Sequence, residues 1–359
     1  MTTVLIDGYA LSDGSGARGI GSYLKRIITG LGSEPGLSVK VLADPSARLP
    51  DSVERVASRR RAPARLHGLE HDLLLPSRLG AVDFDVFHSP AQHPPRRAPG
   101  PWIQTLHDVT PLTRPHPLIA RERRRWLRVG PRLRKAAAVA AVSRFSADEG
   151  IRHLGIDPSR VMVIPQGIDR GVFRPGEGPD DDAPYLLYVA AWGPNKGFAE
   201  ALSVIARVAE RGLPHRLVLA GPQDAWMLSQ IRGAVAASSR PDRVEIAGYL
   251  EDLPAAYRGA TAVLMSSRCE GFGLPVLEAM ACGTPVVAFS NSSIPEVLGD
   301  AGTLVEDGDS AAMADAVLRL IRDPDARAEL VQRGLERAAR FRIEDEIAAY
   351  AELIRSVAR

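Results

Sequence analysis

The sequence predicts an α/β protein made of two doubly wound domains, each with a parallel sheet covered by helices. Three observations support this prediction. Short β-rich apolar runs alternate with amphipathic helical patterns throughout the chain, which is typical of parallel sheets with helical crossovers. The alternating series occurs twice, before and after a segment rich in Gly, Pro and Asp. The length of 359 residues also favours two domain cores rather than one.

The first series lies in the N-terminal half. An amphipathic stretch at 20–31 (IGSYLKRIITGL) follows its first apolar run. Ser146 and Glu149 have the spacing of a capping box, so we expect them to cap a helix. The runs expected as strands are 3–7, 38–42, 86–89, 102–107, 138–143 and 161–165.

The second series begins after residue 184. An amphipathic stretch at 199–212 (AEALSVIARVAERG) separates its first two runs. The expected strands are 185–190, 216–220, 244–247, 262–266 and 285–290. The intervening segment 166–184 is the expected hinge. We therefore place the domains at 1–168 and 169–342, and assign 343–359 to a polar-faced C-terminal helix able to pack back on the first domain.

Composition indicates an ordinary soluble protein, with 45% hydrophobic and 25% charged residues. The longest purely apolar run, 136–142, is far shorter than a membrane span, and the first strand pattern has no leader-like segment before it. The two cysteines, Cys269 and Cys282, are too few to predict a disulfide framework or a zinc site. We expect a cytoplasmic protein, with peripheral attachment at the inner face of the membrane as an open alternative.

The net charge of +2 conceals an asymmetry between the two halves. Residues 1–165 carry 25 Lys and Arg against 15 Asp and Glu, whereas the remainder carries 20 against 28. Part of the basic excess forms a cluster at 59–61 and a run at 121–138. Both are interpreted either as a solvated surface or as a patch for an anionic acceptor or a membrane. Few aromatic residues are interleaved, which disfavours nucleic acid. The candidate patch residues are Arg121, Arg123, Arg124 and Arg125.

A short helix is expected inside the segment 269–287 (CEGFGLPVLEAMACGTPVV). Pro275 favours the first turn of a helix, and Gly283 supplies a left-handed end. Pro285 then opens the next strand at its first residue, a position where a strand accepts proline. The segment thus predicts a strand, a glycine loop, a short helix and another strand.

The glycine loop before this helix predicts a ligand site. Gly271 and Gly273 leave backbone N–H groups uncovered at the helix N-terminus, which with the helix dipole form an anion site. Glu270 and Glu278 stand on either side, and carboxylates beside an anion site need neutral donors such as sugar hydroxyls. A ligand that carries phosphates between two sugars would engage all three features. The alternative is a tight strand–helix turn with glutamates on the surface, although the spacing here is more specific than such a turn requires.

These residues resemble retaining glycosyltransferases of the GT-B fold, carbohydrate-active family four. The family signature is two glutamates separated by seven residues, here Glu270 and Glu278. The resemblance covers nearly the whole chain, and it implies two Rossmann-like domains facing a central cleft. The first would bind the acceptor and the second a nucleotide-diphosphate sugar. The other similar segments are RGIGSYLKRIITGL, TLHDVTPLTRP, VIPQGIDRGVFRP, LVLAGP and VEIAGYLEDLPAAYRGA.

The resemblance also implies a role for each matching residue. Glu278 would hold the ribose hydroxyls, and Glu270 would contact hydroxyls of the transferred sugar. Lys196 would neutralise the leaving diphosphate as the glycosidic bond breaks. His107 would reach hydroxyls of the donor sugar. The diphosphate would meet the backbone at Gly271, Phe272, Gly273 and Leu274, with room left by Gly19 and Gly21.

One departure from the family pattern concerns a second phosphate-binding cation. Many members carry an arginine shortly before the lysine, where this chain has Ala190, Ala191 and Trp192. Arg268 is our hypothetical substitute. No nucleophile–base triad is suggested by spacing, and family precedent favours front-face attack without a covalent carboxylate. The acidic run at 180–182 lies in the hinge, so we expect neither a metal nor any cofactor besides the sugar nucleotide.

Other functions are weighed against this interpretation. A literal GxGxxG pattern at 14–19 suggests an NAD-dependent enzyme. However, the expected strand ends near Gly8 and five residues intervene before Gly14, which is poor geometry for that motif. A GT-B epimerase or hydrolase of a nucleotide sugar is a nearer alternative. A non-catalytic sugar-nucleotide-binding module is a third, although it would be expected to lose Glu270 or Lys196.

The identities of donor and acceptor are the least constrained by the sequence. The similar segments match a mannosyltransferase-type branch best, so GDP-mannose is the first choice, with UDP- and dTDP-sugars left open. The acceptor is expected to be a glycan, a lipid or a small molecule. The basic N-terminal half favours an anionic or membrane-bound acceptor.

Overall fold

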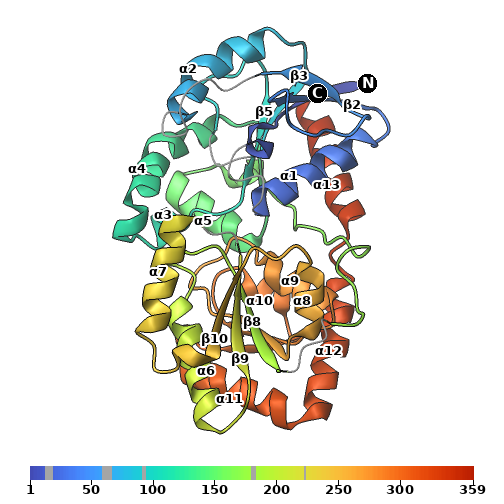
Figure 1. Ribbon diagram of the computed structural model, residues 1–359. Coiled ribbons are helices and arrows are strands. Elements are labelled where there is room, and N and C mark those ends of the chain that lie inside the picture. The colour runs from blue at the N-terminus through green and yellow to red at the C-terminus, as the bar shows by residue number, and fades with distance from the viewer. Residues whose placement is uncertain (13–18, 59–66, 91–93, 179–182, 222–223) are drawn as a thin grey trace. The chain divides into compact units, whose positions relative to one another are not determined.

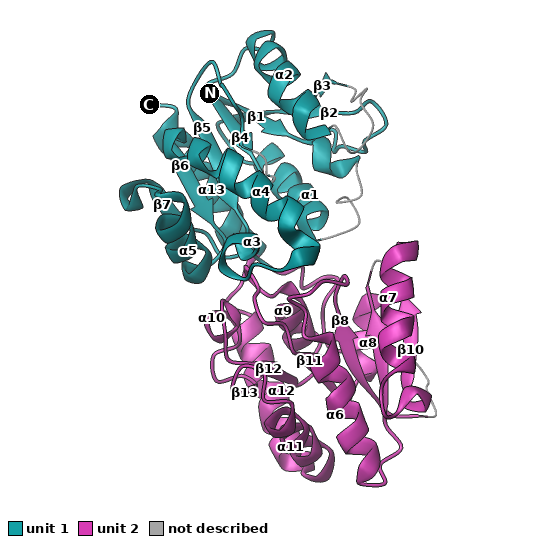
Figure 2. Ribbon diagram, turned by 90° about the vertical axis from the view of Figure 1, so that its left-hand side faces the viewer, with its two compact units in different colours: residues 1–167, 343–359 teal, residues 168–342 magenta. Residues whose placement is uncertain are grey.

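A computed structural model describes residues 1–12, 19–58, 67–90, 94–178, 183–221 and 224–359. The chain divides into two compact units (Figure 2): unit 1 comprises Met1–Gly167 with Ile343–Arg359, and unit 2 comprises Ile168–Arg342. The GxGxxG pattern apart from its last glycine, the basic cluster at 59–61 and the acidic run at 180–182 lie outside the described residues.

Unit 1 contains a seven-stranded sheet in the order β3-β2-β1-β4-β5-β6-β7, and all of its neighbouring strands are parallel. The strands are β1 Thr2–Asp7, β2 Leu37–Ala43, β3 Glu54–Ala57, β4 Val86–Ser89, β5 Trp102–Leu106, β6 Ala138–Ala141 and β7 Val161–Val163. Its α-helices are α1 Gly19–Gly32, α2 His67–Gly80, α3 Thr110–Thr113, α4 Ala120–Val129, α5 Arg144–Leu154 and α13 Ile343–Val357. Its 3-10 turns are η1 Tyr9–Leu11, η3 Pro117–Ile119, η4 Gly130–Lys135 and η5 Pro158–Arg160.

Alternation along the strands builds a core on each face of this sheet. Val4 and Ile6 of β1 point into a layer formed with α1 and α13, whereas Leu5 points into a layer formed with α2, α4 and η4. Figure 1 shows α1 and α13 side by side over the sheet. Gly30 of α1 lets α13 come this close, because a Cβ at that position would lie 2.4 Å from Ile347 Cδ1.

Unit 2 contains a six-stranded parallel sheet in the order β10-β9-β8-β11-β12-β13. The strands are β8 Tyr185–Val189, β9 Arg216–Ala220, β10 Val244–Gly248, β11 Ala262–Met265, β12 Val286–Phe289 and β13 Thr303–Val305. The helices are α6 Phe198–Glu210, α7 Ala225–Ala236, η6 Pro241–Arg243, α8 Leu253–Gly259, α9 Leu274–Ala281, α10 Ile294–Leu298, α11 Ser310–Arg322 and α12 Pro324–Ala338. Apolar residues of α6 and α11 pack on one face of the sheet in a continuous core.

The fold class and the strands expected from the sequence are confirmed, with two omissions. Both missing strands lie at sheet edges: β3 is mostly exposed and reads ERVA, and β13 has only three residues. The capping box expected at Ser146 and Glu149 was wrong. Ser143 caps α5 by accepting from Ser146 N at 3.0 Å, because the helix begins one turn earlier than the spacing suggested. Glu149 instead pairs with Arg152 and His153.

A buried polar network joins α13 to the sheet of unit 1. Tyr23 donates its hydroxyl hydrogen to Tyr350 Oη at 2.7 Å, and Thr105 Oγ1 lies 2.9 Å from Tyr23 Oη. His88 Nε2 lies 2.9 Å from the same Thr105 oxygen. Burial, followed by the tyrosine partner, raises the pKa of Tyr23 well above its usual value, so the phenol stays neutral.

His88 makes the stability of unit 1 depend on pH. Burial, followed by the nearby His107, lowers the pKa of His88 from 6.5 to about 3. Between these values the unfolded chain binds more protons than the folded chain, so stability falls as pH drops below the unfolded pKa. We expect a loss of about 2 kcal/mol at about pH 5 relative to about pH 7.5, measured by urea unfolding. The variant His88→Gln, which cannot titrate, should flatten this pH slope; an undiminished slope would contradict the assignment.

Candidate functional site

The helix expected inside 269–287 is present as α9. It begins at Leu274, with Pro275 in its first turn, and Gly273 precedes it at φ +97°. This φ favours glycine, and a Cβ at Gly273 would lie 2.7 Å from Ile294 Cδ1, so the isoleucine side chain would also have to shift. Gly283, at φ +77°, follows the helix end as expected. The next strand, β12, starts at Val286, one residue after Pro285.

The N-terminus of α9 presents free donors. In the described part of the chain, the N–H groups of Phe272, Gly273 and Leu274 have no hydrogen-bond partner. The Phe272 ring is buried and packs edge-on against Phe341 at 5.9 Å, which fixes the loop. Three fixed amides at a helix start can bind an anion without reorganising.

Lys196 and Glu270 meet beside this loop. Lys196 Nζ donates to Glu270 Oε1 at 2.7 Å, and both side chains are largely but not fully buried. The loops that carry them follow β8 and β11, which are neighbours in the sheet. Asn195 Nδ2 donates to Cys269 O at 3.1 Å, and Arg268 N donates to Asn195 O at 2.7 Å, so both the side chain and the backbone of Asn195 join the two loops.

A close approach at Gly197 fixes the position of Lys196. A Cβ at Gly197, whose φ is +62°, would lie 1.7 Å from Ser266 O, so only glycine fits between β11 and the start of α6. Ser266 Oγ donates to Gly197 O at 2.7 Å, and Tyr188 Oη donates to Lys196 O at 2.9 Å. The lysine therefore extends from a rigid turn.

Glu278 lies one turn into α9 and is oriented by a tyrosine. Tyr257 of α8 donates its hydroxyl hydrogen to Glu278 Oε2 at 2.7 Å. Burial, followed by the adjacent Glu278 carboxylate, raises the pKa of Tyr257 well above its usual value, so the phenol remains a donor. Tyr257 was not expected as a site residue from the sequence, although it lies in the segment VEIAGYLEDLPAAYRGA, which resembles the family.

Arg268 is engaged by two carboxylates. Its guanidinium bonds to Glu200 and lies 3.6 Å from Asp307 Oδ1, and it stacks over the Phe289 ring at 5.6 Å. To reach a phosphate it would have to leave both acidic partners. This geometry favours a role in holding the β11 loop over the phosphate-binding role hypothesised from the sequence.

The candidate residues of unit 1 lie around the start of α1 and the end of β5. Gly19 and Gly21 occupy the first turn of α1. His107 donates from Nε2 to Pro90 O at 2.9 Å, and its ring packs edge-on against Tyr23 at 4.9 Å. Burial lowers the pKa of His107, so the imidazole is neutral and Nδ1 keeps its lone pair as an acceptor.

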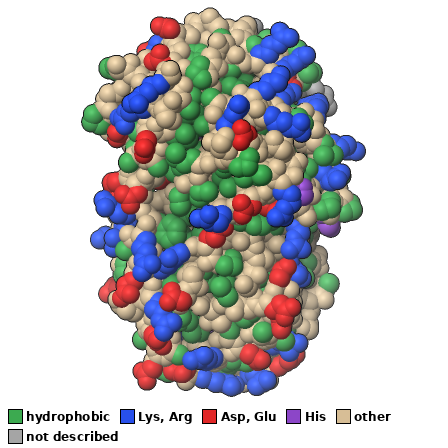
Figure 3. All heavy atoms as spheres, turned by 180° about the vertical axis from the view of Figure 1, so that it is seen from behind, with side chains coloured by type: hydrophobic (Ala, Val, Ile, Leu, Met, Phe, Trp, Pro, Cys, Tyr) green, Lys and Arg blue, Asp and Glu red, His purple; other side chains and the backbone are tan. Residues whose placement is uncertain are grey.

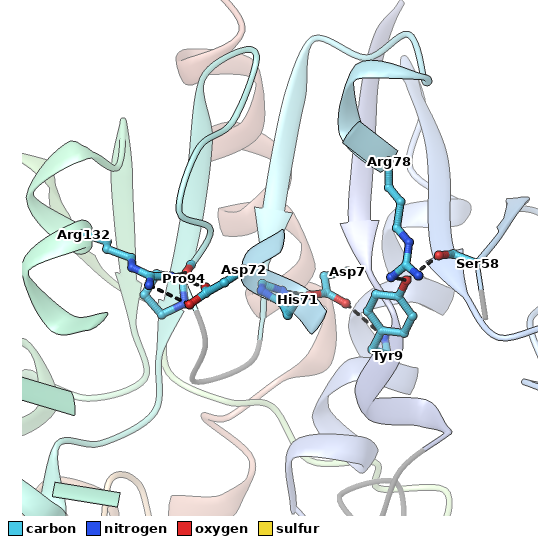
Figure 4. Close-up of polar contacts among 8 residues, drawn as sticks. All are labelled: Asp7, Tyr9, Ser58, His71, Asp72, Arg78, Pro94 and Arg132. Atoms are coloured by element: carbon cyan, nitrogen blue, oxygen red, sulfur yellow. Dashed lines mark hydrogen bonds and ion pairs between the residues drawn. The ribbon is translucent and has the colours of Figure 1, made fainter. Parts of the chain in front are cut away.

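A polar cluster at the strand ends of unit 1 was not expected from the sequence (Figure 4). Asp7 Oδ2 lies 3.2 Å from His71 Nε2 of α2, and Arg78 Nη1 donates to Tyr9 Oη at 2.5 Å. Asp72 receives both terminal nitrogens of Arg132, at 2.5 and 2.9 Å. These contacts come from three positions along α2, so the cluster anchors that helix.

The arginines of the basic patch lie on α4. Arg121, Arg123 and Arg124 are exposed, whereas Arg125 is partly buried and burial lowers its pKa. Over unit 2, Figure 3 shows acidic and basic side chains interspersed on the face that it presents, without one dominant sign. The basic excess of residues 1–165 falls within unit 1.

Two features are absent from the described residues, a cluster of metal-ligating side chains and a helix that could span a membrane. Within them, no group of three or more His, Cys, Asp or Glu side chains is placed to hold a metal ion. None of the helices in those ranges has the length and apolarity needed to cross a membrane.

Two family models match the chain. Residues 17–171 match the model described as Glycosyltransferase Family 4, and residues 183–323 match Glycosyl transferases group 1. The first lies within unit 1 apart from its last residues, and the second lies within unit 2.

Curated relatives carry related names. The chain is 30% identical over 370 residues to a D-inositol 3-phosphate glycosyltransferase of Geodermatophilus obscurus, covering 90% of this chain and 81% of the relative. It is 29% identical over 276 residues to O-antigen chain mannosyltransferase B of Escherichia coli, covering 71% of this chain and 70% of the relative. With the D-inositol 3-phosphate glycosyltransferase of Acidothermus cellulolyticus, 32% identity extends over 58% of this chain and only 52% of the relative.

Solved structures share the fold of the whole chain. Sucrose-phosphate synthase from Thermosynechococcus elongatus superposes with a TM-score of 0.83 at 21% identity, covering 99% of both chains. Anabaena Alr3699/HepE in complex with UDP and glucose gives a TM-score of 0.77 at 18% identity, covering 99% of this chain and 100% of the other. At these identities the likeness concerns the fold.

Proposed function

Because the chain belongs to glycosyltransferase family 4 and is a transferase, we propose that it moves a hexose from a nucleotide-diphosphate sugar to an acceptor. One observation carries the proposal: two adjacent loops of unit 2 bring together Lys196, Glu270 and the free amides at the start of α9. This set contains a cation and N–H donors for a diphosphate and a carboxylate for sugar hydroxyls. Glu278, on the same helix, supplies a second carboxylate.

Each group has a distinct proposed role. The amides of Phe272, Gly273 and Leu274 bind the diphosphate, and the Lys196 ammonium offsets the charge that develops on it as the glycosidic bond breaks. Glu270 accepts from hydroxyls of the transferred sugar. Glu278 accepts from the ribose hydroxyls. Lys196 Nζ pairs with Glu270 Oε1 at 2.7 Å, so the ammonium lies where it can serve both the sugar-binding carboxylate and the phosphate.

Two further substrate contacts are proposed for unit 1. The Nδ1 lone pair of His107 accepts from a donor-sugar hydroxyl, since its Nε2 hydrogen is already used by Pro90. Gly19 and Gly21, without side chains, leave room for the diphosphate.

We propose that the reaction retains the anomeric configuration and needs no metal. The acceptor hydroxyl attacks C1 of the donor sugar from the same face from which the leaving group departs. The departing phosphate oxygen takes the acceptor proton. The C1–O bond to phosphate breaks as the bond to the acceptor oxygen forms, so no covalent enzyme intermediate is required. Activity lost in EDTA and restored by Mn²⁺ would refute the metal-independent scheme.

GDP-mannose is the first proposed donor. A mannosyltransferase among the relatives supports mannose, whereas the neighbouring structure holding UDP and glucose keeps UDP-sugars in contention. A thermal-shift panel of GDP-, UDP-, ADP- and dTDP-sugars tests the choice, because a ligand at 100 times its Kd stabilises by about 2.7 kcal/mol. We expect the largest upward shift with GDP-mannose. A clear shift with a UDP-sugar and none with GDP-mannose overturns the choice of donor and leaves the reaction class intact.

The proposed acceptor is a glycan, lipid or small molecule, and the surface of unit 1 favours one presented at an anionic membrane. Leu69, Leu73 and Leu74 of α2 are 55%, 59% and 40% exposed, although polar contacts anchor that helix. On α4, Leu127 is 55% exposed and neighbours the exposed Arg124. Exposed leucines beside arginines suit a peripheral contact with acidic lipids.

Sedimentation with vesicles tests this contact. We expect the protein to pellet with phosphatidylglycerol-containing vesicles more than with neutral ones, and less at high salt. Replacing Arg121, Arg123 and Arg124 with alanine should reduce pelleting. The matched control replaces three exposed arginines of unit 2, Arg207, Arg211 and Arg232. Equal pelleting of both triple variants contradicts the proposal.

Release of nucleoside diphosphate, measured with and without acceptor, distinguishes the transferase from the alternatives. These are a nucleotide-sugar epimerase or hydrolase and a non-catalytic binding module. A transferase releases nucleoside diphosphate much faster when acceptor is present. A hydrolase releases it without acceptor, and a binding module releases none.

A further inference from the structure

Ser292, in the loop after β12, has an unusual backbone conformation. Among the described residues it is the one non-glycine with a positive φ, at +49°. Side chains disfavour this left-handed region, whereas glycine adopts it freely. A serine in this disfavoured conformation indicates that its side chain has a role that glycine could not fill.

The hydroxyl of Ser292 holds the main chain of Glu270. Glu270 N donates to Ser292 Oγ at 2.9 Å, and Ser292 Oγ donates in turn to Asn291 Oδ1 at 2.9 Å. The neighbouring Ser293 donates from Oγ to Glu270 O at 3.0 Å. The peptide groups on both sides of Glu270 are therefore fixed by consecutive serines.

Asn291 anchors this arrangement to the rest of unit 2. Its Nδ2 donates to Ser267 O at 3.0 Å and to Asp307 Oδ1 at 2.7 Å. The loops after β11, β12 and β13 are thus connected through one side chain. A glycine at 292 would allow the same turn but would leave the Glu270 N–H without this acceptor.

We propose that Ser292 is a positioning residue that sets Glu270 for the sugar of the donor. The proposal rests on the role of Glu270 in the proposed function. Lys196 holds the carboxylate end of Glu270, and Ser292 holds its backbone end, so the carboxylate has a defined direction before substrate arrives. The left-handed conformation is retained because only a side chain at this position brings an oxygen to the Glu270 N–H.

The test compares the affinity for a nucleoside diphosphate with that for its sugar conjugate. The probe pairs are GDP with GDP-mannose and UDP with UDP-glucose, titrated calorimetrically into the full chain. The ratio of the two Kd values isolates the sugar contribution. We expect Glu270→Ala to lower this contribution strongly, and Ser292→Gly to lower it by about three- to tenfold while leaving the nucleoside diphosphate affinity unchanged.

Stability is measured in parallel. Ser292→Gly removes a hydrogen bond but relieves the left-handed conformation, so its thermal midpoint should stay near that of the wild type. Ser292→Ala loses the bond and keeps the disfavoured φ, so it should melt lower. Ser238→Gly is the matched control, because it also removes a serine hydroxyl, one that donates to Val235 O, at a position far in the sequence from the Ser292 loop. It should leave the ratio of the two Kd values unchanged.

The outcomes separate this inference from the function on which it rests. If Glu270→Ala lowers the sugar contribution and Ser292→Gly does not, the positioning role is wrong. It is also wrong if Ser292→Gly weakens GDP or UDP by the same factor as the sugar conjugate, because that indicates a general loosening. If no nucleoside diphosphate of the thermal-shift panel binds the wild type, or Glu270→Ala leaves the ratio unchanged, the proposed function of the site fails first.

Discussion

Replacing Lys196 with alanine is expected to lower kcat by about 10²–10³-fold, the range typical of removing one preorganised group that stabilises developing charge. The Lys196 ammonium is held by the rigid turn at Gly197 and lies 2.7 Å from Glu270. In the proposed role, Lys196 offsets charge that grows on the diphosphate in the transition state, so kcat should fall more than the donor affinity. Release of nucleoside diphosphate from the donor identified in the thermal-shift panel measures the effect.

Two companion variants sharpen this result. Lys196→Arg keeps the charge but changes its shape and reach, so partial activity is expected. Lys40→Ala removes a lysine that pairs with Glu54 on the sheet of unit 1, and should leave kcat unchanged. A Lys196→Ala enzyme within about threefold of the wild-type kcat would show that the lysine does not stabilise the departing phosphate.

Replacing Glu278 with alanine is expected to raise the donor Kd by about 10- to 100-fold, since a hydrogen bond to a charged group contributes about 1.5–3 kcal/mol. The carboxylate is held at Oε2 by the buried Tyr257 hydroxyl. The loss should appear in binding, because ribose contacts are the same in ground and transition states. Tyr257→Phe, which leaves Glu278 in place but removes its orienting donor, should give a smaller loss in the same direction.

A nucleotide without ribose hydroxyls shows whether Glu278 acts on them. The 2′,3′-dideoxy nucleoside diphosphate should bind the wild type about as weakly as the parent nucleotide binds Glu278→Ala, and the variant should not distinguish the two. Glu329→Ala, at an exposed glutamate paired with Arg333 on α12, is the control and should bind normally. A variant that still discriminates between the nucleotides places the ribose contact elsewhere.

Local signals in the sequence were sufficient to predict the donor-side loop. Pro275 lies in the first turn of α9 and Gly283 follows its end, as expected, because helix starts and ends depend on residues within a few positions. The buried parallel strands were also predicted correctly, because they form apolar runs in the sequence. The edge strand β3 was missed because its mostly exposed residues carry little apolar signal, and β13 was missed because it has only three residues.

The supporting contacts of the site were not predictable in the same way. Tyr257 meets Glu278 across 21 residues, Ser292 meets Glu270 across 22, and Asp7 meets His71 across 64. Each pairing depends on how separate loops meet at the strand ends, and no short-range pattern specifies it. Arg268 shows the converse: its position next to Glu270 suggested a phosphate ligand, and the fold gave it two acidic partners from other loops.

Unit 2 is proposed to bind a nucleoside diphosphate at Lys196, Glu278 and the start of α9. The direct test is calorimetric titration of the wild-type chain with GDP, UDP, ADP and dTDP, each beside its monophosphate. We expect one diphosphate to bind well, its monophosphate at least about tenfold more weakly, and Lys196→Ala to reduce that difference. Absence of binding by all four diphosphates, or equal binding of diphosphate and monophosphate, would contradict the assignment of this loop.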